Sequence, residues 1–470
     1  MTELAQRPGS APATGELPAG LACAGCDYVA PAGSLPLRCP NARPDDDIDH
    51  VLRRTLDTSR VAWPGGGEDN PFVRYRTLWL GFQRARAAGR TDAALQAEID
   101  ELDRAVAAVD GHGFRITSLV EADGILIKDE TRNVSGSHKA RHLFGTLLEL
   151  RLAGADDPAR PLAIASCGNA ALAAAVVARA ARSELLVFVP TDADAAVMRR
   201  LAQLEARVAV CERRPDELGD PTVLRMRERI EAGAVPFTCQ GNENGLAIEG
   251  GLTLGYELAD QLRERGRSVD HLFVQVGGGA LASSVMQALA EARALGALTV
   301  MPRIYAVQTT DTHPLSKAYD LVLARLNKRL GARLDRASVM LRAAVADGLA
   351  DDELAWVARH RSDFMWPWQS TAHSTASGIL DDETYDWLAV VRGMLATGGH
   401  PVLVDEATLA QANEMARATT GIDVDHTGSA GLAGLLHLRR HGAINPKDTC
   451  AVLFTGALRN GSNPRNGGLP

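Results

Sequence analysis

Four short motifs contain residues suited to chemistry, and each follows a strand-like run of the chain. They are Ser135-Gly136-Ser137-His138-Lys139, Ser166-Cys167-Gly168-Asn169, Gly277-Gly278-Gly279-Ala280-Leu281 and Thr455-Gly456. A neutral amine attacks aldehydes, and the positive end of a helix disfavours the ammonium form of a lysine placed there. Lys139 begins a helix-like segment, so it is the candidate nucleophile. The plain alternative is a solvated surface lysine.

The other three motifs supply binding groups. Small residues ahead of the Ala-rich run 170–181 leave backbone N–H groups free to hold a carboxylate, and Asn169 can donate to a ligand oxygen. Three glycines between a strand and a helix form a phosphate cradle, without the G-x-G-x-x-G spacing of dinucleotide sites. The Thr455 hydroxyl can hydrogen-bond a ring nitrogen. Taken singly, each motif is also explained by a tight turn or a helix cap.

The segments that must position these motifs alternate between strand-like and helix-like patterns. The strand-like runs are 124–130, 161–166, 185–190, 207–212, 271–276, 303–308, 400–405 and 449–454. Several are continuously apolar, which is typical of strands covered on both faces. This alternation predicts an α/β fold with a doubly wound, mostly parallel sheet, in which ligands bind at the carboxyl ends of strands. A longer helical pattern runs from Asn70 to about Val109.

The composition excludes several functional classes. The chain has 470 residues, with 50 Lys and Arg against 58 Asp and Glu, so its formal net charge is −8. Nucleic-acid binding would need a basic stripe, and none is visible. A membrane span would need a charge-free apolar run of roughly 18–20 residues, and no run is that long. Seven cysteines are too sparse for a disulfide scaffold, and no cationic stretch precedes an apolar one near residue 1. We expect a soluble cytoplasmic enzyme acting on a small molecule, without a nucleic-acid or membrane partner.

Together, the four motifs fit one ligand, pyridoxal 5′-phosphate, which needs an amine, a phosphate cradle and a partner for its ring nitrogen. From about residue 115 to 460, the chain resembles the tryptophan synthase β-subunit family of pyridoxal-phosphate enzymes, known as fold type II. Within that family it is most similar to threonine synthases and serine/threonine dehydratases. The resemblance implies a large domain (64–139 and 251–470), a small mobile domain (140–250) and a homodimer.

The resemblance also implies a role for each motif residue. Lys139 would be the catalytic residue, joined to the cofactor as a Schiff base and later moving the α-proton of the substrate. The residues implied to bind the cofactor are Lys139, His138, Asn169, Gly277, Gly278, Gly279, Ala280, Leu281 and Thr455. Those implied to bind the substrate carboxylate are Ser166, Cys167 and Gly168.

The implied reaction is β- or γ-elimination or replacement on a small amino acid. A neutral hydroxyl at Thr455 does not keep a proton on the ring nitrogen, which suits elimination and replacement better than transamination. The first expectation is a lyase or synthase most like threonine synthase, which converts O-phosphohomoserine to threonine and phosphate. The alternative is a serine/threonine dehydratase (an ammonia-lyase) or a related enzyme of specialised amino-acid metabolism. Outside enzymes, the competing class is a non-catalytic relative with the same fold.

The N-terminal part departs from this pattern. Residues 1–20 are expected to be disordered, and 21–63 resemble the short zinc-ribbon-like segment with which threonine synthases often begin. Cys23, Cys26 and Cys39 are present, but Ala42 stands where the fourth cysteine would be. His50 or Asp45 would have to complete a zinc site. We therefore predict a degenerate remnant that holds no metal.

The sequence allows two interpretations for each of two further features. His426 stands where the family pattern has a different residue, and it either touches the substrate or packs at a helix start. The aromatic run 365–374 either walls the active site or forms a buried loop.

Overall fold

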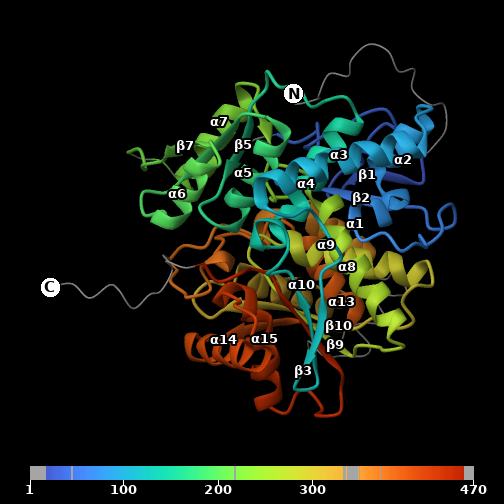
Figure 1. The fold of residues 1–470 in the computed structure, drawn as a ribbon. Coiled ribbons are helices and arrows are strands. Elements are labelled where there is room, and N and C mark those ends of the chain that lie inside the picture. Colours follow the sequence, from blue (N-terminus) through green and yellow to red (C-terminus); the bar gives the residue numbers. More distant parts are fainter. Residues whose placement is uncertain are drawn as a thin grey trace.

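The computed structural model of the chain has two mostly parallel β-sheets covered by helices, which confirms the predicted α/β fold (Figure 1). It describes residues 17–43, 46–215, 217, 219–331, 335, 348, 350–370 and 372–459. The larger sheet has the strand order β11-β10-β9-β12-β4-β3, and only β3 is antiparallel to its neighbour. Its strands are β3 (Leu119–Ala122), β4 (Ile125–Asp129), β9 (His271–Gln275), β10 (Arg303–Thr309), β11 (Pro401–Val404) and β12 (Cys450–Phe454).

Both faces of the larger sheet are buried, which explains its continuously apolar strands. Leu272 and Val274 of β9 pack with one group of helices, and Phe273 between them packs with the other group. The first group comprises α8 (Ala247–Glu264), α9 (Ala280–Ala294), α10 (Pro314–Leu330), α12 (Asp351–Ala358) and α13 (Trp387–Thr397). The second comprises α14 (Glu406–Thr420) and α15 (His426–Arg440), which lie together beside the sheet in Figure 1.

The smaller sheet comes entirely from residues 162–236, inside the segment expected to form a small domain. Its strand order is β7-β6-β5-β8, and all of its pairs are parallel. The strands are β5 (Leu162–Ala165), β6 (Leu185–Val189), β7 (Arg207–Val210) and β8 (Val235–Pro236), with helices α4 (Lys139–Leu152), α5 (Asn169–Ala181), α6 (Ala195–Gln203) and α7 (Pro221–Glu231) around them. All eight predicted strands are therefore present, while β3 and β8 were not predicted.

The N-terminal part is more broken than its helical pattern predicted. The antiparallel strands β1 (Ala19–Cys23) and β2 (Leu52–Leu56) form a separate pair, and β1 begins inside the segment expected to be disordered. Residues 1–16 lie outside the described part of the chain. The single helix expected from Asn70 is divided into α1 (Pro71–Arg74), the short turn η1 (Arg76–Leu78), α2 (Leu80–Ala87) and α3 (Asp92–Asp110). The divisions fall where Trp79 is extended and where Gly89 takes a φ of 89°.

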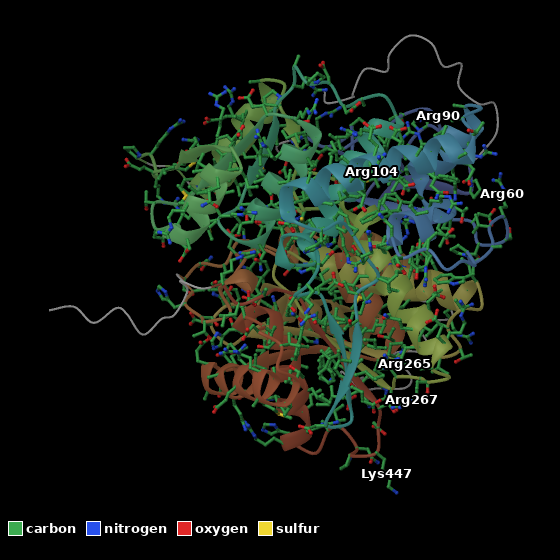
Figure 2. The ribbon with its side chains drawn as sticks, in the orientation of Figure 1. Arg60, Arg90, Arg104, Arg265, Arg267 and Lys447 are labelled. Carbon is green, nitrogen blue, oxygen red and sulfur yellow. The ribbon has the colours of Figure 1, made fainter. Side chains whose placement is uncertain are left out.

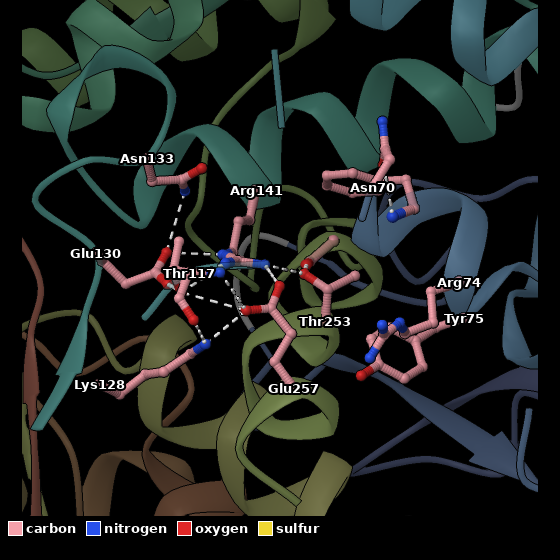
Figure 3. A network of polar contacts seen from close by, with 12 residues as sticks. Asn70, Arg74, Tyr75, Thr117, Lys128, Glu130, Asn133, Arg141, Thr253 and Glu257 are labelled. Atoms are coloured by element: carbon pink, nitrogen blue, oxygen red, sulfur yellow. Dashed lines mark hydrogen bonds and ion pairs between the residues drawn. The ribbon is translucent and has the colours of Figure 1, made fainter. Parts of the chain in front are cut away.

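A buried ionic network joins the start of α4 to the larger sheet and to α8 (Figure 3). The Arg141 guanidinium donates to Glu130 at 2.7 and 2.9 Å and to Glu257 at 2.5 Å. The Lys128 ammonium donates to the other Glu257 oxygen at 2.6 Å. All four side chains are buried, and their two positive and two negative charges balance. Thr117 and Thr253 donate to or accept from the same groups, so the network is richly hydrogen-bonded.

The outer surface carries dispersed charge. The basic side chains labelled in Figure 2 project at separate places, among them Arg90 and Arg104 near the N-terminal helices and Arg265, Arg267 and Lys447 at the opposite end. Among the helices that the structure describes, none has the length and apolar character needed to cross a bilayer.

We predict that Glu257→Gln destabilises the protein strongly. The change removes one negative charge and leaves Lys128 and Arg141 buried with only Glu130, which should lower the free energy of unfolding by about 3–5 kcal/mol. The matched control is Glu264→Gln on the same helix, where the side chain is exposed. Urea unfolding followed by circular dichroism measures both. Equal midpoints for the two variants would contradict the prediction.

Candidate active site

The loop between β4 and α4 brings Lys139 to the carboxyl end of the larger sheet. Ser135 and Gly136 both take positive φ values, 56° and 70°, so the chain turns sharply before the helix. His138 then donates from its backbone N–H and from Nδ1 to the carbonyl oxygen of Thr455, both at 3.1 Å. Lys139 is the first residue of α4. Two hydrogen bonds from its neighbour therefore fix Lys139 against the Thr455 loop.

Thr455 is held as a hydrogen-bond donor toward any ligand. Gln275 Nε2 donates to Thr455 Oγ1 at 2.6 Å and also to the Gly428 carbonyl oxygen at 2.8 Å. The second contact identifies that atom as the amide nitrogen, because a carbonyl oxygen only accepts. With its oxygen accepting from Gln275, the Thr455 hydroxyl directs its own proton elsewhere. This arrangement suits a partner with a lone pair, such as an unprotonated ring nitrogen.

Asn169 lies beside the Thr455 loop. A Cβ built on Gly456 would be 2.7 Å from Asn169 Nδ2, and this amide also donates to the Asp425 carboxyl. Its oxygen, Oδ1, is buried without a hydrogen-bond partner among the described residues. The preceding Gly168 begins α5 with no side-chain cap, so the first N–H groups of the helix are open to an anion.

The glycine loop follows β9 and leads into α9. Gly279 has a φ of 100° and begins the helix without a side-chain cap. A Cβ on Gly277 or Gly278 would collide with Asp381 or Tyr385, so the loop leaves no room for larger residues. The Gly278 N–H donates to the Asp381 carboxyl, so the N–H groups left for a ligand are those of the uncapped first turn of α9. Ala280 and Leu281 form the first turn of α9 and are buried.

Asp381 and Asp386 are site residues that the sequence analysis missed. The charge of Lys139 acts on both carboxyl groups, and Asp386 N–H donates to the Gly278 carbonyl oxygen at 3.0 Å. Burial raises the pKa of Asp381 to about 6 and that of Asp386 to about 7, against the lowering effect of Lys139. The acidic run 381–383 could have indicated Asp381 as a site residue. We did not select it because acidic runs are usually exposed to solvent.

A cavity of about 660 Å³ opens at the N-terminal end of α5. Its lining includes Cys167 and Gly168, which were implied to bind the substrate, and Asn169, which was implied to bind the cofactor, but Ser166 is not among the lining residues. It also includes His426, which favours the substrate reading of that residue over the packing one. Three acidic residues line the cavity, Asp194, Glu406 and Asp425, against a single arginine, Arg459. The cavity therefore favours ligands without a second negative group.

The aromatic run 365–374 divides between packing and the cavity. Lys317 of α10 lies over the Trp366 ring at 3.7 Å, and His313 packs on Trp368 at 4.6 Å between ring centroids. His373 and Ser374 line the cavity. Of the described residues in this run only Met365 is buried, so the run is not a buried loop, and its end lies at the cavity.

The residues present fit pyridoxal 5′-phosphate. The uncapped start of α9 provides N–H groups for a phosphate, and Lys139 provides an amine. Asn169 Oδ1 and His138 Nε2 are buried polar atoms without partners among the described residues. Such atoms are costly unless a ligand or water meets them. Burial and the neighbouring Lys139 hold the pKa of His138 well below its ordinary value, so its imidazole is neutral.

We predict that Asp386→Asn stabilises the cofactor-free protein at pH 8. The folded-state pKa of Asp386, about 7, lies above its ordinary 3.8, so the folded form favours the protonated acid. The contribution of Asp386 to the free energy of unfolding is most favourable below about pH 4 and becomes less favourable as the pH rises to about 7. An amide cannot ionise, so the variant should gain about 2–4 kcal/mol at pH 8 and little at pH 4–5. Thermal unfolding at both pH values tests this, with the exposed Asp423→Asn as control. A pH-independent difference would contradict it.

Comparison with known proteins identifies the family. Residues 113–456 match the family described as pyridoxal-phosphate dependent enzymes. No curated protein matches the chain. Among solved structures, it is similar to a threonine deaminase from T.th. (20% identity, TM-score 0.52, covering 77% of this chain and 99% of that one). It is also similar to maize serine racemase (16%, 0.52, 77% and 94%) and to diaminopropionate ammonia lyase from Escherichia coli (16%, 0.53, 77% and 88%).

At these identities the structural likeness shows the fold, which is that of the fold type II enzymes. The family match covers most of the chain and includes the four motifs, which follow β4, β5, β9 and β12. The chain belongs to the pyridoxal-phosphate dependent enzyme family, and its cofactor is pyridoxal 5′-phosphate.

Proposed function

We propose that the protein is an ammonia-lyase that eliminates a β-hydroxyl or β-amino group from a small α-amino acid. This was the alternative reading of the sequence, and the first reading was a threonine synthase. The observation that carries the proposal is the charge of the cavity, which is lined by Asp194, Glu406 and Asp425 against Arg459. The deaminases and ammonia-lyases among the similar structures support it.

The cavity charge argues against a phosphorylated substrate. A threonine synthase must bind the phosphate of O-phosphohomoserine in addition to that of its cofactor. Dianions of this kind are usually held by several arginines or lysines. Here three carboxyl groups would repel it. A neutral hydroxyl group or a positively charged β-amino group meets no such repulsion.

The chain's own residues supply binding and proton transfer. The open N–H groups at the start of α5, with Cys167 and Gly168, would hold the substrate carboxylate. Lys139 Nζ would take the α-proton of the substrate. The nearby carboxyl of Asp381, with its pKa raised to about 6, is suited to give a proton to a departing hydroxyl group or to pair with an ammonium group. The bound cofactor withdraws electrons from Cα, and this acidifies the α-proton.

The orientation of Thr455 favours elimination over competing reactions. Because its hydroxyl accepts from Gln275, it would donate to the ring nitrogen and leave that atom unprotonated. An unprotonated ring withdraws electrons more weakly, so negative charge at Cα is short-lived. Loss of a β-substituent relieves that charge at once, whereas transamination and racemisation need it to persist.

The test is to incubate the holoenzyme with L-serine, L-threonine, 2,3-diaminopropionate and O-phosphohomoserine. We expect a 2-oxo acid from at least one of the first three and no phosphate from the fourth. Serine would give one ammonia per pyruvate, and diaminopropionate would give two because both amino groups are released. Release of phosphate together with threonine would instead establish a synthase. Formation of the D-amino acid without a 2-oxo acid would establish a racemase.

We also predict that borohydride reduction of the holoenzyme labels Lys139 alone. The whole chain contains five lysines, at 128, 139, 317, 328 and 447, so peptide mapping can distinguish them. Lys128 is buried against Glu257, while Lys317, Lys328 and Lys447 have exposed side chains. Lys139→Ala should lose both the label and the activity, and Lys447→Ala should keep both. Labelling of Lys139→Ala equal to that of the wild type would contradict the assignment.

A further inference from the structure

The N-terminal segment brings four metal-ligand side chains together, away from the active site. Cys23 ends β1, Cys26 follows in the next turn, Cys39 lies in the following loop, and His50 shortly precedes β2. One ligand atom from each lies within 4.8 Å of every other. Cys26 Sγ and Cys39 Sγ are 3.7 Å apart, and Cys23 Sγ is 3.4 Å from His50 Nδ1. Asp45, the other residue considered as a fourth ligand, is outside the described part of the chain.

These separations match the edges of a zinc tetrahedron. With bonds of about 2.3 Å to sulfur and about 2.0–2.1 Å to nitrogen, tetrahedral geometry puts two sulfurs about 3.8 Å apart and a sulfur and a nitrogen about 3.5 Å apart. A disulfide would instead need about 2.05 Å. All seven cysteines are free thiols. The two measured edges therefore have the lengths expected in a coordination sphere, and the sulfur pair is too far apart for a covalent bridge.

Groups around the four ligands are arranged to support a bound cation. His50 Nε2 lies 3.0 Å from Asp46 Oδ2, which leaves Nδ1 as the metal-facing atom. A carboxylate behind a ligating imidazole is the usual way to fix its tautomer and raise its basicity. Backbone N–H groups of Gly25 and Cys26 donate to Cys23 Sγ, and Asn41 Nδ2 donates to Cys26 Sγ at 3.5 Å. Hydrogen bonds from such surrounding donors hold the ligand side chains in a fixed orientation.

We propose that Cys23, Cys26, Cys39 and His50 form a tetrahedral zinc site. The missing fourth cysteine at Ala42 had suggested a metal-free remnant, but the fold supplies His50 in its place. Three thiolates and one imidazole in a tetrahedron favour zinc over the harder divalent cations. The four protein ligands leave no position for a substrate, so the site is structural.

The site would fasten the N-terminal segment to the body of the enzyme. Just beyond His50, Arg54 is buried and donates to Glu249 of α8 and Glu291 of α9. Just before it, Asp49 N–H donates to the Ala358 carbonyl oxygen at 2.7 Å, and Asp47 accepts from Arg361 and Ser362. Ala358, Arg361 and Ser362, which make these contacts, precede Asp381 and Asp386 in the chain by about 20 residues. A zinc ion at this site would therefore help to fix the segment that precedes Asp381 and Asp386.

The experiment measures metal in the purified full-length protein by plasma mass spectrometry. We expect about one zinc per chain, retained at roughly 1 nM free zinc. Cys26→Ser and His50→Ala should lose it, whereas Cys167→Ser should keep it. Asp46→Asn should weaken zinc binding about 10–100-fold, measured by competition with a chelator.

Wild-type protein keeps the test decisive where a variant does not fold. Stripped of metal and given cobalt(II), it should develop thiolate-to-cobalt absorption bands and tetrahedral ligand-field bands. The proposal is overturned if reduced wild-type protein takes up neither zinc nor cobalt, if zinc survives in the Cys26 and His50 variants, or if the bound metal is iron. Metal content does not depend on the reaction catalysed, so this test is separate from that of the proposed function.

Discussion

The pairing of Arg141 with two buried carboxylates is the constraint on which the active site depends. Arg141 stands two residues beyond Lys139, the proposed nucleophile, and its guanidinium is buried between Glu130 and Glu257. A charge in such a place cannot move without losing its partners, at a cost of several kcal/mol. Since Glu130 directly follows β4 and Glu257 lies within α8, the pairing fixes the first turn of α4 to both. This network therefore fixes the position of Lys139.

Helix α8 carries a second charge network that extends the same constraint to the N-terminal segment. Arg54 of β2 bonds Glu249, which precedes Glu257 on the same helix, and Glu249 also accepts from Leu80 N–H. The N-terminal strand pair is therefore attached to the helix that orders the catalytic loop. In both networks one arginine faces two carboxylates, so each needs its full set of partners. Small residues allow the close approach: a Cβ on Gly250 would collide with the Arg141 carbonyl.

The sequence predicts the parts of this structure that are set by local pattern. The apolar strands of both sheets and the four motifs at their ends were predicted because burial on two faces leaves continuous apolar runs. The short strand β8 and the strand pair β1-β2 were not predicted, because they show no continuous apolar run. In β2, for example, Arg53 is exposed. The long helix expected from Asn70 was wrong because Trp79 turns inward to pack on Phe72, and the chain follows it.

What the sequence does not predict is set by residues that meet only in space. From the sequence, His50 and Asp45 are equal candidates for a fourth ligand, because neither stands at a regular spacing from Cys39. Only the pairing of β2 with β1 places His50 beside the three cysteines. The substrate class depends in the same way on cavity charge, because Asp194, Glu406, Asp425 and Arg459 come from four separate segments. A net charge of −8 gives no hint of this cluster. The motifs proposed to bind the cofactor are each contiguous in the chain, because one backbone turn suffices for a phosphate or a ring atom. Selection among substrates needs a whole cavity, so a family is easier to predict from sequence than a reaction.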